Sequence, residues 1–143
     1  MKPKRDRLRI LKEKAWLLQS EFIRLRDKGI CFTCGARNWD EELGEWSIKG
    51  MQAGHFRHGV LDFDDDNLKC QCLRCNHFLS GNLAEYSRRL IKERGLDSVE
   101  KLHLKADNAL KGEKLGEDDY KKLIEKIKSK IHRLSTPQNL ISR

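Results

Sequence analysis

Two short cysteine pairs constrain this chain more than any other feature. The pairs are Cys31-Phe-Thr-Cys34 and Cys72-Leu-Arg-Cys75, and 37 residues separate them. Each Cys-x-x-Cys turn can direct two thiolates at one ion, so the two turns supply the four ligands of a closed tetrahedral zinc site. Because such a site leaves no position for a water molecule, the expected zinc is structural. The intervening segment is too long for a plain zinc knuckle and has room for a hairpin.

The bulk composition favours a single small domain with helical extensions. The chain has 143 residues, of which 36% are charged and 38% hydrophobic, and this balance suits long amphipathic helices better than a thick core. No apolar run approaches the roughly 20 residues that a membrane span needs. Five cysteines without a visible secretory signal favour metal binding over disulfides. The fifth, Cys70, is expected to be a spare buried thiol, with competition as a ligand as the alternative.

The positive charge is concentrated in the two ends of the chain. The net charge of +8 divides into +6 over residues 1–30, −3 over residues 31–75, +1 over residues 76–110 and +4 over residues 111–143. Basic arms can neutralise DNA phosphates, and an acidic centre can recruit a divalent cation. The alternative is that the lysine-rich helices are simply solvated.

Hydrophobic periodicity predicts an α+β fold with long helices. A helix is expected over residues 5–28, ended by Gly29, and a strand over 45–51 that leads into Ala53-Gly54-His55-Phe56. Further helices are expected from the 80–82 turn to Gly95, from a cap at Asp97 or Ser98 to about residue 110, and over 117–134. The chain divides into a basic helix over 1–30, a zinc-stapled core over 31–95 and a helical extension over 96–143.

His55 is the candidate for acid–base chemistry. A neutral imidazole can take a proton from water near pH 7, and phosphodiester hydrolysis needs such a base together with a divalent cation. The case for His55 depends on its position, because it lies between the two cysteine turns and upstream of Asn67 and Asn76.

This arrangement resembles a zinc-stapled HNH nuclease of the ββα-metal type. More specifically, residues 20–105 resemble the phage NinG/Rap recombination proteins. The matching pieces are Arg26-Asp27, Gly29, Cys31-Phe-Thr-Cys34, Ala53-Gly54-His55-Phe56, Phe63, Asn67, Gln71-Cys72-Leu-Arg-Cys75-Asn76, Ser80-Gly81-Asn82, Tyr86, Leu90, Ile91 and Gly95. The position of Asn76 directly after the last cysteine also resembles phage recombination endonuclease VII.

The resemblance implies a fold, an activity and roles for particular residues. The fold is a ββα-metal core with one structural zinc, flanked by long helices. The activity is that of a phage or prophage endonuclease in the bacterial cytoplasm, which cuts branched recombination intermediates of the Holliday junction or D-loop type with Mg²⁺ or Mn²⁺. His55 matches the general base, Asn67 the asparagine that orients the base and steadies the hairpin, and Asn76 a ligand of the divalent cation.

One position departs from the HNH pattern. Many HNH enzymes carry an acidic residue or a histidine directly before the base, whereas this chain has Gly54. The cation then needs help from elsewhere, and His77, beside Asn76, is the best candidate. The other candidates are His58, Gln52 and the aspartates at 64–66.

Four arginines flank the expected site and suit phosphate oxygens. They are Arg57, Arg74, Arg88 and Arg89. A homodimer is a further expectation, since two copies would match a symmetric branched substrate. Two rival functions remain open: a non-catalytic zinc module that binds DNA or a recombination partner, and a sequence-specific homing or restriction nuclease of the same architecture.

Overall fold

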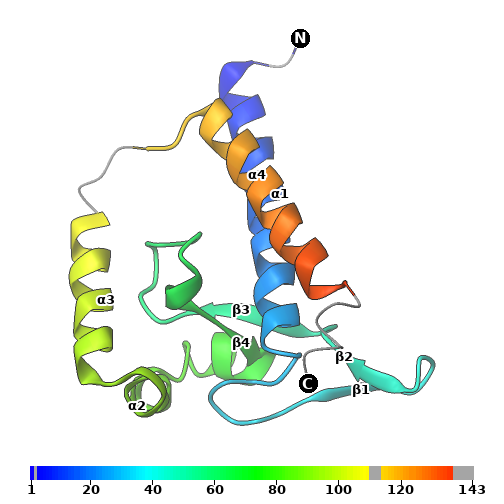
Figure 1. Cartoon of the computed structure of the whole chain (residues 1–143), viewed down its shortest axis with the longest axis vertical. Helices are drawn as coiled ribbons and strands as arrows, with labels where there is room; N and C mark the ends of the chain where they lie inside the picture. Colours follow the sequence, from blue (N-terminus) through cyan, green and yellow to red (C-terminus); the bar gives the residue numbers. More distant parts are fainter. Residues whose placement is uncertain (2, 110–113, 137–143) are drawn as a thin grey trace.

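Two long helices lie side by side and run in the same direction (Figure 1). They are α1 (Lys4–Arg26) and α4 (Glu117–Leu134), in a computed structural model that describes residues 1, 3–109 and 114–136. Their bounds confirm the helices expected over 5–28 and 117–134. The pair is held by apolar side chains that are almost fully buried, among them Ala15, Ile23 and Ile127.

The apolar stripes of α1 and α4 cover each other. Tyr120 and Ile124 pack on Ala15 near the start of both helices, and Ile127 packs on Phe22 further along. Within the described residues these stripes are therefore satisfied inside one chain, and they give no support to the expected homodimer. No described helix is both long enough and apolar enough to cross a membrane.

An antiparallel hairpin lies against α1 and carries His55. It consists of β3 (Met51–His55) and β4 (Leu68–Cys72), in a register that pairs Met51 with Cys72 and His55 with Leu68. Side chains alternate between the faces of a strand, so Ala53 and Leu68 point at α1, where they join Phe22 and Ile23 in one apolar cluster. The opposite face of the hairpin meets the chain that follows β4.

The single strand expected over 45–51 is wrong, because the chain turns at Gly50. Glycine is suited to this turn, where φ is +75°. The residues before it form β2 (Glu45–Ser47), which pairs with β1 (Asn38–Asp40) in a second small hairpin, and those after it form β3. The described residues thus form two separate two-stranded sheets, and the predicted site residues His55 and Cys72 both lie in the β3–β4 sheet.

Two shorter helices close the other face of the β3–β4 hairpin. After β4 comes a π-helical turn, η2 (Arg74–Phe78), followed by α2 (Leu83–Arg94) and α3 (Leu96–Ala109). The third helix begins at Leu96, before the cap expected at Asp97 or Ser98, because Gly95 ends α2 and the chain enters α3 directly. The buried Tyr86 hydroxyl donates to the Gly54 carbonyl oxygen at 3.0 Å, which fixes α2 to β3.

The acidic run at 64–66 ties the β3–β4 connection to all four α-helices. Its carboxylates accept bonds or form ion pairs as follows: Asp64 with Lys105 of α3, Asp65 with Gln19 of α1 and Lys130 of α4, and Asp66 with Arg94 of α2. These partners explain the three consecutive aspartates structurally, since each neutralises or orients a different helix side chain. The run is not free to hold a divalent cation without breaking these contacts.

Candidate functional site

The four paired cysteines converge as their spacing predicts. The Sγ atoms of Cys31, Cys34, Cys72 and Cys75 all lie within 4.8 Å of one another, and those of Cys34 and Cys72 are 3.7 Å apart. A tetrahedral zinc with Zn–S bonds of about 2.3 Å places its sulfur ligands about 3.8 Å apart. The donor set and its spacing therefore fit a metal such as zinc, with no position left for catalysis.

The cysteine turns are held together by the strand between them. The first turn follows α1, and its Phe32 amide donates to the Cys70 carbonyl oxygen at 2.8 Å, so that it docks on β4. Cys72 ends β4 and Cys75 lies in η2. Cys70 is fully buried beside this cluster but is not a member of it. Burial raises the pKa of the Cys70 thiol to about 12, which keeps it protonated and inert.

His55 is positioned by two contacts that the sequence did not reveal. Its ring stacks on Trp16 of α1, with centroids 5.2 Å apart and planes inclined by 20°. Its Nε2 donates to Asp62 Oδ1 at 2.9 Å, and this hydrogen bond lowers the pKa of Asp62 below its usual value. A carboxylate that holds one ring nitrogen fixes the tautomer and leaves the other nitrogen, Nδ1, as the proton acceptor.

The His55–Asp62 pair opens into a cavity on the basic helix. The cavity has a volume of about 340 Å³ and is lined by Arg9, Lys12, Glu13, Trp16, His55 and Asp62. Only 19% of the His55 side chain is exposed, so the ring is accessible on one side. The arrangement can take a proton from a water molecule next to cationic side chains that attract phosphates.

Asp62 lies seven residues after His55, in the irregular connection between β3 and β4. Leu61, directly before it, adopts a left-handed conformation with φ of +56°, which is uncommon for a branched residue and marks a constrained turn. No spacing rule in the sequence links a strand histidine to a carboxylate in the following loop. The only signal for Asp62 as the partner of His55 was the acidic character of the loop that contains it.

Asn67 is buried and closes the same connection. Its Oδ1 accepts from the Arg57 amide at 2.8 Å, and its Nδ2 donates to the carbonyl oxygens of Arg57 and Val60, both at 3.1 Å. Asn67 thereby holds the ends of the loop that carries Asp62. Its described bonds are to the backbone, whereas the His55 ring is held by Asp62 and Trp16.

Asn76 lies on the other face of the hairpin from His55. Its Nδ2 donates to Gln52 Oε1 at 2.7 Å, and Gln52 and His55 are three residues apart in β3, so their side chains point to opposite faces. His77 is exposed, with its ring 5.1 Å from that of Phe78. The structure therefore brings Asn76 to Gln52 and leaves both Asn76 and His77 outside the His55 cavity.

The space beside Gly54 is occupied by Gln71. A Cβ atom on Gly54 would lie 1.9 Å from Gln71 Oε1, and the Gln71 amide is fixed by bonds to Thr33 and to the Gly81 carbonyl oxygen. The oxygens next to Gly54 and Asn76 are those of the Gln71 and Gln52 amides, and the nearby Glu93 carboxylate is paired with Lys69 at 2.9 Å. Mg²⁺ prefers anionic oxygen ligands. The residues around Gly54 and Asn76 therefore do not by themselves fit a divalent cation.

Replacing Gly54 with alanine is expected to destabilise the core by about 1–3 kcal/mol, because the added methyl group overpacks a site that the fixed Gln71 amide fills. Urea denaturation measures the change. Gly116→Ala is the control, since its added Cβ would come no nearer than 3.6 Å to another side chain, and it should cost less. Equal losses in both variants would show that the Gln71 contact is not responsible.

Three of the four predicted DNA-contacting arginines are engaged within the chain. Arg57 bonds to Asp107 at 2.7 Å and to the His103 ring at 3.0 Å, both on α3. Arg88 and Arg89 share the Glu85 carboxylate at 2.6 and 2.7 Å, and these hydrogen bonds lower the pKa of Glu85 to about 2. Arg74 is exposed on η2. Their contact with DNA stays a prediction.

Comparison with known proteins identifies relatives among phage proteins. The sequence model of the family described as Bacteriophage Lambda NinG protein matches residues 2–137. The chain is 32% identical over 116 residues to Protein ninG of Escherichia phage 933W, covering 68% of this chain and 52% of that protein. It is 33% identical over 100 residues to Protein ninG of Salmonella phage P22, covering 61% and 43%. The chain spans about half the length of these curated relatives, and no solved structure matches it.

Proposed function

The chain belongs to the NinG family of phage proteins, and we propose that it is an HNH-type DNA endonuclease that cuts branched recombination intermediates, of the Holliday junction or D-loop type. The observation that carries the proposal is the His55–Asp62 pair, which is stacked on Trp16 and opens into a cavity lined by Arg9 and Lys12. A histidine held by a carboxylate beside cationic side chains suits hydrolysis of a phosphodiester.

The chemistry assigned to the chain is proton removal at His55. Nδ1 takes a proton from a water molecule, and the resulting hydroxide attacks the phosphorus atom. The new P–O bond forms as the bond to the 3′ oxygen breaks. The leaving oxygen takes a proton from solvent water, which gives a 3′-hydroxyl and a 5′-phosphate, and His55 returns its proton to solvent. Asp62 keeps the ring oriented and stabilises its charged form, while Arg9 and Lys12 attract the substrate phosphates.

The finer fold assignment is part of the proposal. A β3–β4 hairpin followed by η2 and α2 beside a four-cysteine cluster supports a ββα-metal core with one structural zinc. Mg²⁺ or Mn²⁺ is proposed as the second cofactor on the resemblance alone, because the amides of Asn76 and Gln52 are not anionic ligands. We further propose that the protein acts on DNA in the cytoplasm of the bacterial host, as a homodimer on two-fold symmetric junctions.

Cleavage of a labelled four-way junction tests the proposal directly. Wild-type protein is incubated with the junction and with a linear duplex of the same sequences, each with Mg²⁺, with Mn²⁺ and with EDTA. We expect cuts near the branch point of the junction and an intact duplex. Cutting of one duplex sequence irrespective of branching would instead favour a sequence-specific homing or restriction nuclease.

The alternative function is a non-catalytic zinc module that binds DNA. The filled space beside Gly54, where many HNH enzymes carry a cation ligand, favours it. This alternative predicts junction binding without cuts in either metal, and binding that is the same in His55→Ala. Binding and cleavage measured on the same junction therefore separate the two functions.

A further inference from the structure

A basic stripe on α1 leads directly to His55. Arg5, Arg9, Lys12 and Trp16 recur at four- and three-residue steps, so their side chains share one face of the helix. Trp16, the last of the four, is the residue on which the His55 ring stacks. Because the helix rises 1.5 Å per residue, the three cations span about 10 Å before the stripe meets His55.

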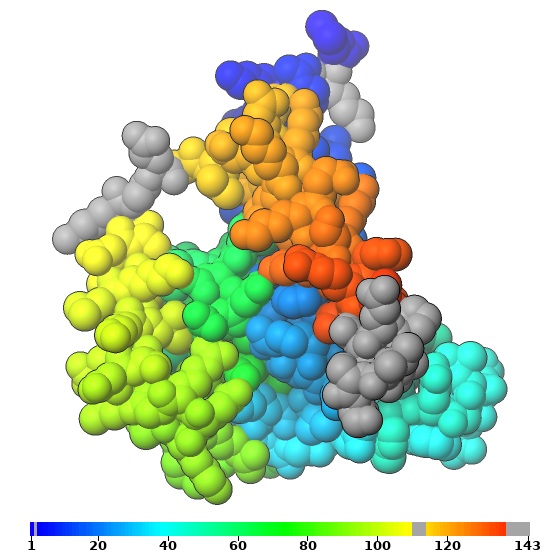
Figure 2. All heavy atoms as spheres, in the orientation of Figure 1, coloured from blue at the N-terminus to red at the C-terminus, as the bar shows by residue number. Residues whose placement is uncertain are grey.

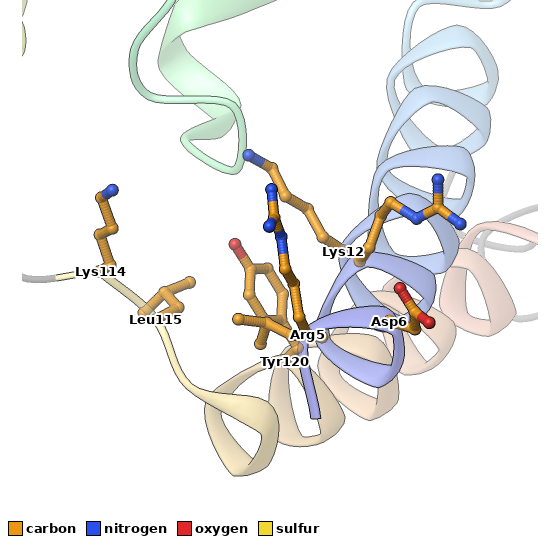
Figure 3. A pocket seen from close by; sticks show the side chains of 8 residues that line it. Arg5, Asp6, Lys12, Lys114, Leu115 and Tyr120 are labelled. Atoms are coloured by element: carbon orange, nitrogen blue, oxygen red, sulfur yellow. The ribbon is translucent and has the colours of Figure 1, made fainter. Parts of the chain in front are cut away.

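The stripe forms one wall of a groove. Near the start of α1 the groove has a volume of about 660 Å³, and four basic side chains line it (Arg5, Arg9, Lys12 and Lys114) against one carboxylate, Asp6. In Figure 3, Arg5, Lys12 and Tyr120 project into the same space, which Lys114 faces from the segment before α4. Tyr120 is largely buried and supplies a rigid floor for the cationic side chains.

The groove is continuous with two neighbouring hollows through Lys12. Lys12 also lines the cavity of His55 and Asp62 and a wider hollow of about 980 Å³ over residues 59–66, which the side chains of α3 and α4 flank. Figure 2 shows the surface hollowed between α3 and α4, with this segment in green at its base. Because Arg9 and Lys12 line both the groove and the His55 cavity, a ligand bound beside Arg5 reaches His55 along these two side chains.

The cations of the stripe are poorly neutralised by the protein. Among the described residues no ion pair within 4.0 Å involves Arg5, Lys12 or Lys114, and the contact of Arg9 with Glu13 is at the 4.0 Å limit with both side chains mostly exposed. By contrast, Lys105 and Lys130 of the neighbouring hollow are paired with aspartates. Exposed cations on one helix face with so little neutralisation match the regular anionic charge of a nucleic-acid backbone.

We propose that Arg5, Arg9 and Lys12 bind the sugar–phosphate backbone of one DNA arm and guide that strand to His55. One strand of B-form DNA carries a phosphate about every 3.4 Å of helix axis, so a stripe of about 10 Å matches about three phosphates. This inference rests on the proposed function for the identity of the ligand, and it adds which surface holds the strand and the path along α1 by which the strand reaches His55.

The salt dependence of junction binding tests this assignment. The groove variant carries Arg5→Gln, Arg9→Gln and Lys12→Gln. For the binding measurement it is made in a His55→Ala background, which prevents cleavage. Fluorescence anisotropy gives its affinity for the junction from about 50 to 200 mM salt. Each lost phosphate contact makes the slope of log K against log salt less steep by about 0.9. We therefore expect the slope of the groove variant to be less steep than that of the His55→Ala protein by about 2–3. Helix content and thermal unfolding confirm that the variant is folded.

The matched control removes the same charge elsewhere. Lys14→Gln/Lys92→Gln/Lys122→Gln neutralises three exposed lysines that line neither the groove nor the His55 cavity, and we expect its slope to fall by less than about 1. Equal slopes for the two triple variants would overturn the groove assignment. So would a wild-type affinity for junction DNA that does not depend on salt.

The outcome is separable from that of the proposed function. With His55 intact, the groove variant should cut the junction with a raised KM, because the stripe holds the strand. Cleavage by wild type together with equal binding slopes would reject the groove and keep the nuclease. A less steep salt dependence in the groove variant, together with no cleavage by wild type, would keep the groove as a DNA-binding surface and reject the nuclease.

Discussion

Replacing His55 with alanine is expected to lower junction cleavage by a factor of about 10²–10⁴, the usual contribution of a positioned general base. The imidazole is the proposed proton acceptor, and no other titratable side chain among the described residues is both stacked on Trp16 and hydrogen-bonded to Asp62. Junction affinity should change little, because the proposed binding surface is the cationic stripe of α1 and not His55. Single-turnover cleavage at saturating protein measures the rate, and anisotropy measures the affinity.

Two further variants make this prediction specific. Asp62→Asn keeps the shape of the side chain but removes the carboxylate that fixes the His55 tautomer, so it should also lose most of the cleavage rate while the protein stays folded. His77→Ala is the matched control, since His77 is exposed and lies outside the His55 cavity, and it should cleave like wild type. A His55→Ala protein that cuts at the wild-type rate would remove His55 from the mechanism.

The sequence predicted those parts of the site whose contacts join residues close together in the chain. The cysteine cluster was predictable because each Cys-x-x-Cys turn fixes two ligands within four residues, and one metal then joins the two turns. The partners of His55 were not predictable in this way. Trp16 comes from a helix about forty residues earlier, and an amphipathic pattern cannot distinguish an aromatic that packs in the core from one that stacks on a histidine.

The position of Asn76 illustrates a different limit. The order of His55, Asn67 and Asn76 in the chain resembles the HNH pattern, but chain order does not specify a strand face. One residue along a strand moves a side chain to the other side of the sheet, and the bond to Gln52 places Asn76 away from the His55 cavity. The single strand expected over 45–51 was wrong for a related reason, because the strand pattern continues across the turn at Gly50.

Removing the metal is expected to have the largest effect on the fold. Apparent zinc-binding free energies in small structural sites are about 10–16 kcal/mol, which is as large as the stability of a whole domain, about 5–15 kcal/mol. Cys31 and Cys34 join the end of α1 to β4 and η2 through this site, and a two-stranded hairpin is marginal without such support. A strong chelator, or Cys34→Ser, should therefore unfold the β3–β4 hairpin together with η2. The helices α1 and α4 share an apolar contact of their own and should keep part of their helicity.

Zinc content measured by atomic absorption, together with circular dichroism and thermal unfolding before and after chelation, follows this change. Cys70→Ala is the matched control, because Cys70 is buried beside the cluster but contributes no ligand. It should retain one zinc per chain and lose only the modest stability that a small buried side chain provides.

If the chelated protein kept its cooperative unfolding transition, the cysteine cluster would not be what stabilises this fold. If Cys70→Ala lost zinc as Cys34→Ser does, the ligand set would have to be redrawn. Because the hairpin that the cluster supports also carries His55, loss of the metal should abolish cleavage even though zinc takes no part in the reaction.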